Sequence, residues 1–416
     1  MTSGADLTAY DAVLKEHYTS DRVVDMTYRN NPLFALMPKY EKFGGKSLPV
    51  PIMYGNPQGR SKTFSQAQSR AQQTSSKFKE FNLTRTKDYS LATIDNETLE
   101  ATKGDPNAFL EAATTEIDGA INSLTRSLAI NMYRDSSSQL GQVSAEPAET
   151  AGTFVIFVKD NGDISNFEVG QVLNIWSAKS GGVQRTSDGT DNSWEIIGVN
   201  RKISGAALTL QGTYDAAGNI AADDYFFVEG DRGIGVSGLG DWIPDADPTS
   251  APFFGVDRTA DVTRLGGHRF DATGMPLEEA LTEGDAIVAQ NGGFAINHYF
   301  MSHTTFKDLK NSLGSKVQYV NLEASPRVSF RGVMVDGVAG PIKCVPDVNC
   351  PDGQIFGLQL EYFKFYSLGP AVRVLSPDGL QMLRQASDDG AEVRYGFYGN
   401  VGCRAPGSSI NIKVAA

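Results

Sequence analysis

The stretch "SKTFSQAQSRAQQTSSKF", residues 61–78, contains no Leu, Ile, Val, Met or Trp. This lack of aliphatic side chains extends from Gly55 to Asn82, where Phe64, Phe78 and Phe81 are the only large apolar residues. A folded domain needs buried apolar surface to offset the conformational entropy that folding removes. The 28 residues from 55 to 82 therefore cannot build a core of their own, and their role must come from their surroundings.

Strand-like sequences flank this polar stretch on both sides. Apolar residues alternate over residues 48–54, and Pro49 and Pro51 confine the expected strand to a sheet edge because proline cannot donate a hydrogen bond to a ladder. On the other side we expect five residues to share one face of an extended segment: Phe81, Leu83, Tyr89, Leu91 and Thr93. The two runs are predicted to be the legs of one long hairpin.

Charge is divided unevenly along the 416 residues. The net charge is −12, which argues against a basic face that grips nucleic acid. Between Arg22 and Lys87, however, 12 Lys and Arg stand against 3 Asp and Glu, a net charge of +9, so the rest of the chain carries −21. A basic segment on an acidic body predicts two surfaces that attract each other, within one molecule or between copies.

Composition limits the class of protein. A hydrophobic content of 40% is enough for a sizeable core, and 43 Gly with 18 Pro favour a turn-rich architecture with much β-structure. The chain shows no secretory signal and no apolar run of about 18 residues that could span a membrane, so we expect it to be made and folded in a cytoplasm. Cys344, Cys350 and Cys403 fit no metal-ligand spacing and are expected to be reduced and buried.

Helix signals are clear in three regions. Within an N-terminal arm, residues 7–14 fit a short helix, and Asn31-Pro32 opens a brief apolar turn that Pro38 closes. Asp105-Pro106 predicts the start of an amphipathic helix that runs to about Arg134, which corresponds to a length of about 42 Å. Further on, two shorter helices are expected after Pro276 and Ser302, respectively.

Residues 146–231 differ in character from the rest. Short β-rich runs alternate with glycine-containing turns, and 13 acidic residues stand against 5 basic ones. This block predicts a small all-β barrel or sandwich inserted into a larger domain. Because helices and strands then alternate around long connections, the fold class is predicted to be α+β.

Motifs for chemistry are weak or absent. Gly233, Gly235 and Gly238 form a G-x-G-x-x-G pattern, but Pro244 and Pro248 follow where a dinucleotide site needs a helix, so a glycine-rich connection is expected. The four histidines, His17, His268, His298 and His303, match no metal signature and are interpreted as structural. "DNGD" at residues 160–163 is predicted to be a hairpin turn rather than a calcium loop. No catalytic residue, cofactor or metal site is predicted.

The order of these elements, and three segments in particular, resembles a known family. The segments are "NPLFALMP" (31–38), "GVDRTADVTRLGGHRFD" (255–271) and "SPDGLQMLR" (376–384) with "AEVRYGFYGNVGCRAPG" (391–407). They are similar to the major capsid protein of tailed bacteriophages, whose Hong Kong-type fold is shared with encapsulin shells. The resemblance implies seven parts: an N-terminal arm (1–45), an extended hairpin loop (46–95), a peripheral domain with a long spine helix (96–145), an inserted β-domain (146–231), a connection (232–269), an axial domain (270–375) and return strands of the peripheral domain (376–416).

The same resemblance implies a structural role rather than an enzyme. Hexamers and pentamers of the chain would form an icosahedral shell around double-stranded DNA, without sequence-specific contacts. The loop of each subunit would lie over a neighbour, with its cations facing acidic subunit bodies and its phenylalanines as anchors. The residues expected at this interface are Arg60, Lys62, Phe64, Arg70, Lys77, Phe78 and Lys79.

Partners and location follow from the resemblance. A separate scaffolding protein is expected because the arm leaves no room for a cleavable scaffold, and a portal and a decoration protein are further expected partners. The protein would be assembled in the host cytoplasm and reside in the virion capsid, away from any membrane. By position only, Lys62, Lys77 and Lys79 are candidates for a cross-link to an asparagine of a neighbour.

Other interpretations stay open at this point. Within the same fold the chain could form an encapsulin-like compartment. A cytoplasmic enzyme with an unrecognised site would have a pocket of perturbed titratable groups. A carbohydrate-binding β-protein would use the insert, through Trp176 or Trp194. Residues 55–82 could also be a solvated linker.

Overall fold

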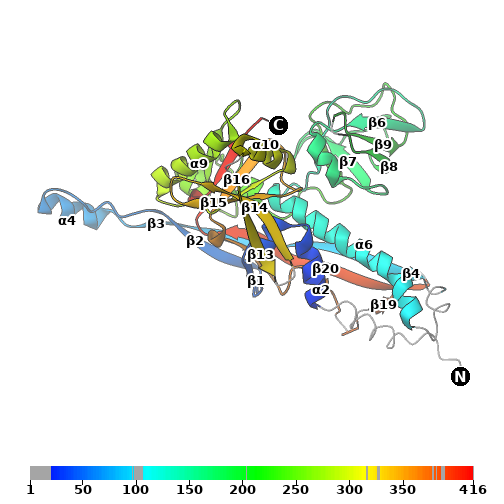
Figure 1. Cartoon of the computed structure of the whole chain (residues 1–416), viewed down its shortest axis with the longest axis horizontal. Helices are drawn as coiled ribbons and strands as arrows, with labels where there is room; N and C mark the ends of the chain where they lie inside the picture. The colour runs from blue at the N-terminus through cyan, green and yellow to red at the C-terminus, as the bar shows by residue number, and fades with distance from the viewer. Residues whose placement is uncertain are drawn as a thin grey trace.

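The computed structural model describes residues 20–95, 97, 106–202, 204–314, 317–325, 328–376, 379–380, 382–385 and 389–415. In these residues the fold is α+β, as predicted, with a long hairpin projecting from one end of the molecule and a small β-structure at the other (Figure 1). The expected helix at residues 7–14, His17 and the expected helix cap Asp105 lie outside the described residues.

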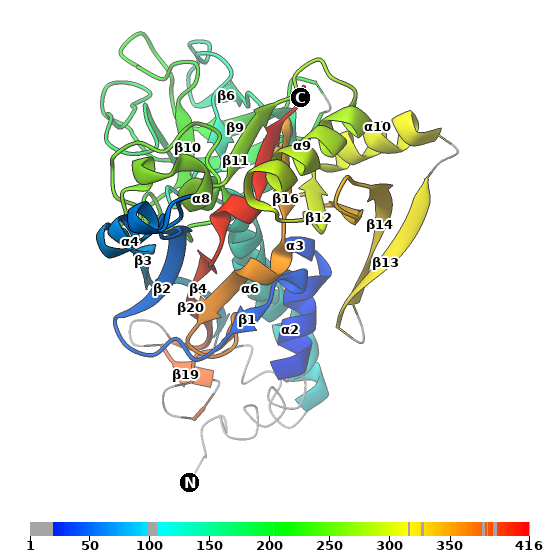
Figure 2. The ribbon, with the colours of Figure 1, turned by 90° about the vertical axis from the view of Figure 1, so that its left-hand side faces the viewer.

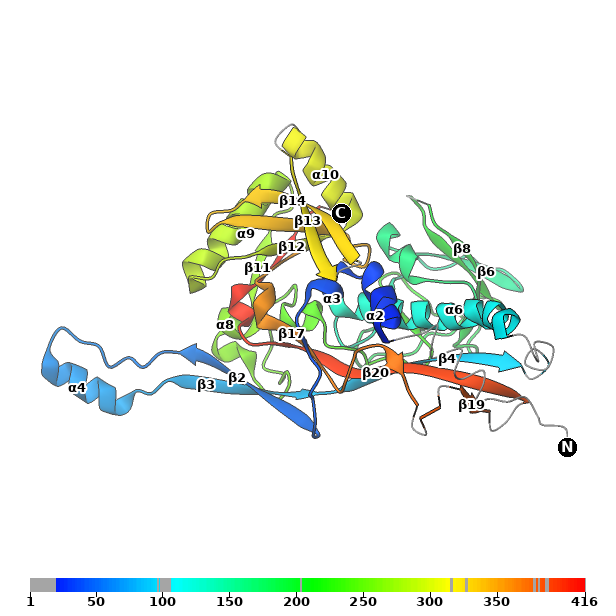
Figure 3. The same cartoon turned by 60° about the horizontal axis from the view of Figure 1, so that its bottom comes forward.

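The longest helix, α6 (Pro106–Tyr133), packs on a sheet built around one long strand (Figure 3). Its apolar stripe is buried, with Ile117, Ile121 and Leu128 each 0% exposed, which confirms the predicted amphipathic helix. In that sheet every strand except β1 pairs with β20; the members are β1 (Lys39–Tyr40), β4 (Thr86–Asp95), β17 (Phe363–Ser367), β18 (Arg373–Val374), β19 (Met382–Arg384) and β20 (Gly390–Cys403).

A seven-stranded sheet forms the second half of the body. Its strands follow the order β11 (His268–Asp271), β21 (Ile410–Lys413), β16 (Gln354–Leu358), β12 (His298–Met301), β15 (Pro341–Pro346), β14 (Val328–Asp336), β13 (Gln318–Ser325). Two helices pack against it: α9 (Leu277–Gly292), which ends at Gly293 with φ 68°, and α10 (His303–Leu313), which Ser302 caps. Both helices occur where the sequence predicts them.

The two sheets exchange strands across the expected boundary at residue 375. β17 and β18 precede it in sequence but pair with β20, whereas β21 follows it and lies between β11 and β16. The C-terminal segment therefore joins both sheets into one body, and sheet membership does not follow a single cut in the chain.

The insert forms a closed barrel. Its sheet order is β5 (Gly141–Gln142), β10 (Tyr225–Val228), β7 (Val172–Trp176), β8 (Trp194–Asn200), β9 (Ala207–Gln211), β6 (Thr153–Phe157). The two end strands meet through hydrogen bonds of 2.8 Å from the Ser144 N–H to the Phe157 carbonyl and from the Lys159 N–H to the Gln142 carbonyl. The predicted hairpin turn at residues 160–163 is wrong: a 3₁₀ helix, η1 (Asn161–Asn166), forms there, and Asp163 pairs with Arg134 at the end of the long helix.

The long hairpin consists of β2 (Ser47–Gly55) and β3 (Lys77–Thr84). These two strands form a sheet of their own, so β2 is an edge strand, as Pro49 and Pro51 predict. The expectation that residues 81–93 share one face is wrong. Phe81 is 0% exposed whereas Leu91 is 50% exposed, because the strand breaks at Arg85 and β4 pairs with β20 instead of β2. A shift of one residue at such a break exchanges the buried and exposed faces.

In the described residues of the N-terminal arm, two helices lie against α6, namely α2 (Ser20–Arg29) and α3 (Pro32–Leu36) (Figure 2). The side-chain oxygen of Asn31 accepts a hydrogen bond from the Phe34 N–H at 3.2 Å, as expected of a helix cap before proline. This confirms the apolar turn predicted at Asn31-Pro32. The sequence analysis did not predict α2.

One buried carboxyl group connects three parts of the body. Asp347, directly after β15, is 0% exposed and accepts hydrogen bonds from the Tyr133 hydroxyl of α6 at 2.8 Å and from the Leu33 N–H of α3 at 3.4 Å. The Asn349 N–H and side-chain amide donate at 2.9 Å each. Burial raises the pKa of Asp347, and these hydrogen bonds oppose that rise.

Replacing Tyr133 by Phe should therefore destabilise the unassembled subunit by about 1.5–3 kcal/mol, because Asp347 would lose its shortest donor in a buried site. Urea denaturation of the purified subunit measures this. The same substitution at Tyr319, which is 53% exposed, is the control and should change the free energy of unfolding by less than about 0.5 kcal/mol. Equal effects at both positions would contradict the assignment.

The G-x-G-x-x-G segment is a packing motif, which confirms the predicted connection. A β-carbon at Gly235 would lie 2.2 Å from the Ser138 hydroxyl, and one at Gly238 would lie 2.2 Å from the Asn131 carbonyl oxygen. Only glycine allows this segment to run so close to the end of α6. The helix that follows, α7 (Leu239–Trp242), has four residues.

Two glycine-to-alanine substitutions should accordingly have opposite effects. Gly238→Ala should destabilise the subunit by about 3 kcal/mol or more, because the added methyl group would clash with backbone carbonyl oxygens of α6 that cannot move aside. Gly119→Ala, inside α6 with no atom within 4 Å of the added carbon, should stabilise it by about 0.5–1 kcal/mol through helix propensity. Thermal unfolding of both variants tests the pair, and a tolerated alanine at position 238 would rule out the packing role.

All three cysteines are free and buried, as predicted. None of the helices in the described part of the chain combines the length and apolar character that a bilayer crossing needs.

Candidate inter-subunit interface

The root of the hairpin is firmly attached to the body. The Phe81 ring lies 5.2 Å from the Trp242 ring and 6.1 Å from the Phe253 ring, measured between centroids. The Asn82 N–H donates to the Phe254 carbonyl at 3.0 Å, and the Arg264 guanidinium donates to the Tyr54 carbonyl at 2.6 Å. The hairpin therefore leaves the body in a fixed direction.

The tip of the hairpin is the segment between β2 and β3, residues 56–76, and it has no buried residue of its own. It contains a helix, α4 (Phe64–Gln73), in which no side chain is buried. The helix is held to the rest of the tip by polar contacts: the Gln58 N–H donates to the Thr74 hydroxyl and the Arg70 guanidinium to the Arg60 carbonyl, both at 3.1 Å. The sequence analysis missed α4 because the stretch has no apolar periodicity, although Ala, Gln and Arg are good helix formers.

All seven residues expected at the interface lie on this hairpin, but in two groups. Arg60, Lys62, Phe64 and Arg70 belong to the tip, whereas Lys77, Phe78 and Lys79 belong to β3. Phe64 is 83% exposed and Phe78 is 61% exposed. Two large apolar side chains thus face solvent on a segment that contributes little to its own core.

The hairpin carries five cations that form no ion pair with the described residues: Arg60, Lys62, Arg70, Lys77 and Lys79. The pKa of Asp257 is lowered mainly by the hydrogen bonds that Thr259 donates to this carboxylate, and Lys79 adds a smaller effect in the same direction.

One interface candidate escaped the sequence analysis. Met53 pairs with Phe78 across the hairpin and is 52% exposed, so the two side chains form one apolar patch. The alternation of side chains along β2 could have identified Met53, because it lies on the same exposed face as Pro49 and Pro51.

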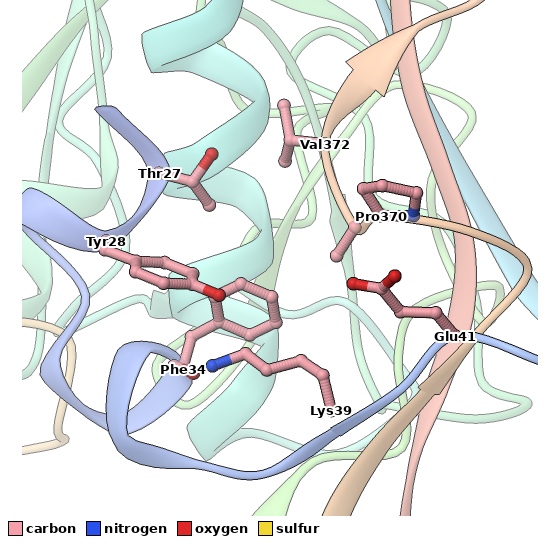
Figure 4. Close-up of a pocket in the computed structure, with 8 residues that line it drawn as sticks. Thr27, Tyr28, Phe34, Lys39, Glu41, Pro370 and Val372 are labelled. Atoms are coloured by element: carbon pink, nitrogen blue, oxygen red, sulfur yellow. Dashed lines mark hydrogen bonds between the residues drawn. The ribbon is translucent and has the colours of Figure 1, made fainter. Parts of the chain in front are cut away.

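A small pocket near the arm is occupied by a lysine (Figure 4). Lys39 donates to the Phe34 carbonyl and, at 3.0 Å, to the Ala35 carbonyl, which are at the end of α3. Its ammonium group lies 4.5 Å from the centre of the Tyr28 ring, and the Glu41 carboxylate lines the same pocket. Burial lowers the pKa of Lys39 to about 7, and Glu41 opposes the shift. This lysine therefore connects β1 to α2 and α3 within the arm.

The Lys39 pocket should make stability depend on pH. Because the pKa is about 7 in the folded chain and ordinarily 10.5, the unfolded chain binds more protons between these values. Stability should therefore rise with pH from about 7 to 10. Lys39→Met should abolish this part of the slope in urea denaturation at pH 7, 8 and 9, and an unchanged slope in the variant would contradict the shifted pKa.

Other candidate sites do not assemble. Among the described residues, no group of His, Cys, Asp and Glu has the arrangement to hold a metal ion. His298 is structural: burial lowers its pKa to about 4, and its Nδ1 lies 2.8 Å from the Asn297 side-chain oxygen. Trp194 is buried at 2% exposure, and the Arg232 guanidinium lies 3.9 Å from the centre of the Trp176 ring. Trp194 is thus unavailable to an external sugar.

No family model matches this chain, and no curated protein matches it in sequence. Solved structures similar to it include the capsid asymmetric unit of cyanophage A-1(L), with 11% identity, 92% of each chain covered and a TM-score of 0.45. The capsid of an empty GTA particle has 9% identity, 92% of this chain and 90% of that chain covered, and a TM-score of 0.44. The holo-SrpI encapsulin complex from Synechococcus elongatus has 8% identity, 92% and 88% covered, and a TM-score of 0.41.

Proposed function

We propose that this chain is the coat protein of a closed icosahedral shell around double-stranded DNA, in which the hairpin of each subunit lies over a neighbour. The observation that carries the proposal is the contrast along the hairpin. Its root is buried among aromatic rings of the body, while its outer part exposes Phe64 in the tip and Phe78 in β3, and its cations form no ion pair with the described residues. Exposed phenylalanine side chains are unfavourable in water. Contact with a second copy would bury them and remove this unfavourable exposure.

The magnitudes favour an interface that acts through many copies. Burying one phenylalanine side chain stabilises a complex by about 1.5–3 kcal/mol, whereas each rim ion pair contributes about 0–1 kcal/mol. A single hairpin contact is therefore modest. Repeated around a hexamer or pentamer and over a shell, such contacts become strong because each holds its neighbours in position for the next.

The remaining charge suits a container for DNA. Outside the basic segment from Arg22 to Lys87 the chain carries −21, so an acidic wall would repel the genome and let it move in and out. In this shell α6 and the β20 sheet form the peripheral domain, the seven-stranded sheet forms the axial domain, and the barrel is the insert. A separate scaffolding protein, a portal and a decoration protein would complete assembly in the host cytoplasm.

An encapsulin-like compartment is the second candidate. The polar hairpin and the insert favour the genome container, and the nucleic acid content of purified particles distinguishes the two. A shell that carries protein cargo and no genome would support the compartment.

Electron microscopy of the protein, expressed alone and passed through a sizing column, should show closed shells or free hexamers and pentamers. Replacing Phe64 and Phe78 together by Ser should reduce the assembled fraction at least tenfold. It should leave the melting temperature of the unassembled subunit unchanged, because neither side chain is buried. Ile234→Ser, at a side chain 58% exposed, is the matched control and should assemble normally. A uniform dimer or tetramer would count against the coat-protein function, and normal shells from the double variant would count against the hairpin as the interlock.

A further inference from the structure

The insert carries the largest excess of negative charge in the chain. Its 13 acidic residues face 5 basic ones between residues 146 and 231. Four of those five cations already form ion pairs: Arg185 with Asp224 and Lys179 with Asp135 at 2.8 Å, Arg201 with Glu168 at 3.0 Å, and Lys159 with Asp223 at 2.5 Å. The insert therefore has almost no free positive charge with which to balance its other carboxylates.

Some of those carboxylates gather at one end of the barrel. The turns that carry Asp191 and Asp215 are tied together, since the Ser187 N–H donates to the Asp191 carbonyl at 2.9 Å and the Asp215 N–H to the Ser187 carbonyl at 3.1 Å. Glu149 is next to Thr150, which bridges to Tyr214, and Glu195 lies at the start of β8. We call Glu149, Asp191, Glu195 and Asp215 the acidic pole. All four are exposed, and none has a cation partner among the described residues.

Exposed apolar side chains lie beside the acidic pole. Thr209 of β9 pairs with Val155 of β6 on one side and with Gly198 of β8 on the other. The register of β8 shifts between Ile196 and Gly198, so Ile197 is the extra residue of a β-bulge. Val155 is 45% exposed and Ile197 42% exposed, whereas Ile196 is buried, so both lie on the outside of these three strands. Glu195 is also exposed, next to the buried Ile196. This outer face combines negative charge with an apolar surface.

The hairpin tip has the complementary properties. It carries exposed cations without ion pairs in the described chain, together with Phe64 at 83% exposure. The tip and the barrel lie at opposite ends of the molecule (Figure 1). Since the root of the hairpin is fixed in the body, these two surfaces can meet only between copies.

We propose that the hairpin tip of one copy docks on the acidic pole and the adjacent β6–β9–β8 face of a neighbouring copy. This inference rests on the proposed function and names the surface that the hairpin engages. Arg60, Lys62 and Arg70 face the carboxylates of the pole, and Phe64 packs against Val155 and Ile197. Because the two surfaces differ, the contact is head-to-tail, and a head-to-tail contact closes into a ring when its rotation permits.

Charge reversal on each side tests the docking. The tip variant carries Arg60→Glu, Lys62→Glu and Arg70→Glu; the pole variant carries Glu149→Lys, Asp191→Lys and Glu195→Lys. Each alone should lower the fraction of subunits in shells at least tenfold in sedimentation at physiological salt. Combining both in one chain should restore assembly to within about threefold of the wild type, because the charges are exchanged rather than removed.

The control has the same charge change on another acidic surface, with Asp271→Lys, Glu279→Lys and Glu283→Lys at exposed positions on β11 and α9. It should assemble normally and should not rescue the tip variant. If a reversed pole fails to give a native melting curve, the milder set Glu149→Gln, Asp191→Asn and Glu195→Gln replaces it, with the same direction of effect.

The outcomes separate the two proposals. If the tip variant fails to assemble while the pole variant assembles normally, the docking site is wrong and the coat-protein function stands. Rescue of the tip variant by the control set would likewise overturn the docking site and point to α9. If the tip variant assembles as well as the wild type, the hairpin is not an interlock: the docking site is overturned, while the coat-protein function stands.

Discussion

The buried Asp347 carboxyl group is the constraint on which the body depends. A polar group away from water must be hydrogen-bonded, because leaving it unsatisfied costs several kilocalories per mole in stability. Here the donors come from α3, from α6 and from the segment after β15. The arm, the long helix and the seven-stranded sheet therefore cannot move apart without exposing or orphaning this carboxyl, and they behave as one rigid unit.

Rigidity of the body gives the hairpin its properties. A two-stranded sheet alone is marginally stable in water, yet β2 and β3 are kept straight because their root, with Phe81 and Leu83 at 0% exposure, is part of the main hydrophobic core. The tip can therefore stay folded without buried apolar residues of its own. Its helix needs only a few polar contacts to keep a shape, which leaves Phe64 and the cations free for another surface.

Local signals in the sequence predicted much of this fold, and non-local ones were missed. The cap at Asn31, the prolines of β2 and the apolar stripe of α6 each depend on residues that are close in sequence. The register change at Arg85 depends on β20, some 300 residues away, and periodicity cannot identify this partner. The helix at residues 161–166 was missed although it has a local cap, Asp160, whose side chain accepts a hydrogen bond from the Gly162 N–H. For the candidate interface, all seven residues expected from the sequence lie on the hairpin, but α4 was not predicted, because a helix without a buried face leaves no apolar pattern.

The length of the hairpin has a simple electrostatic reason in the proposed shell. Two bodies that each carry a large negative charge repel, and salt screens charges beyond about 8 Å at physiological ionic strength. Cations close to their own body would be neutralised there and could not attract a neighbour. With nine residues in β2, at about 3.3 Å each, the hairpin places its basic tip well beyond that screening distance. The positive charge thus stays available, and it acts only where it comes into direct contact with a carboxylate surface of another copy.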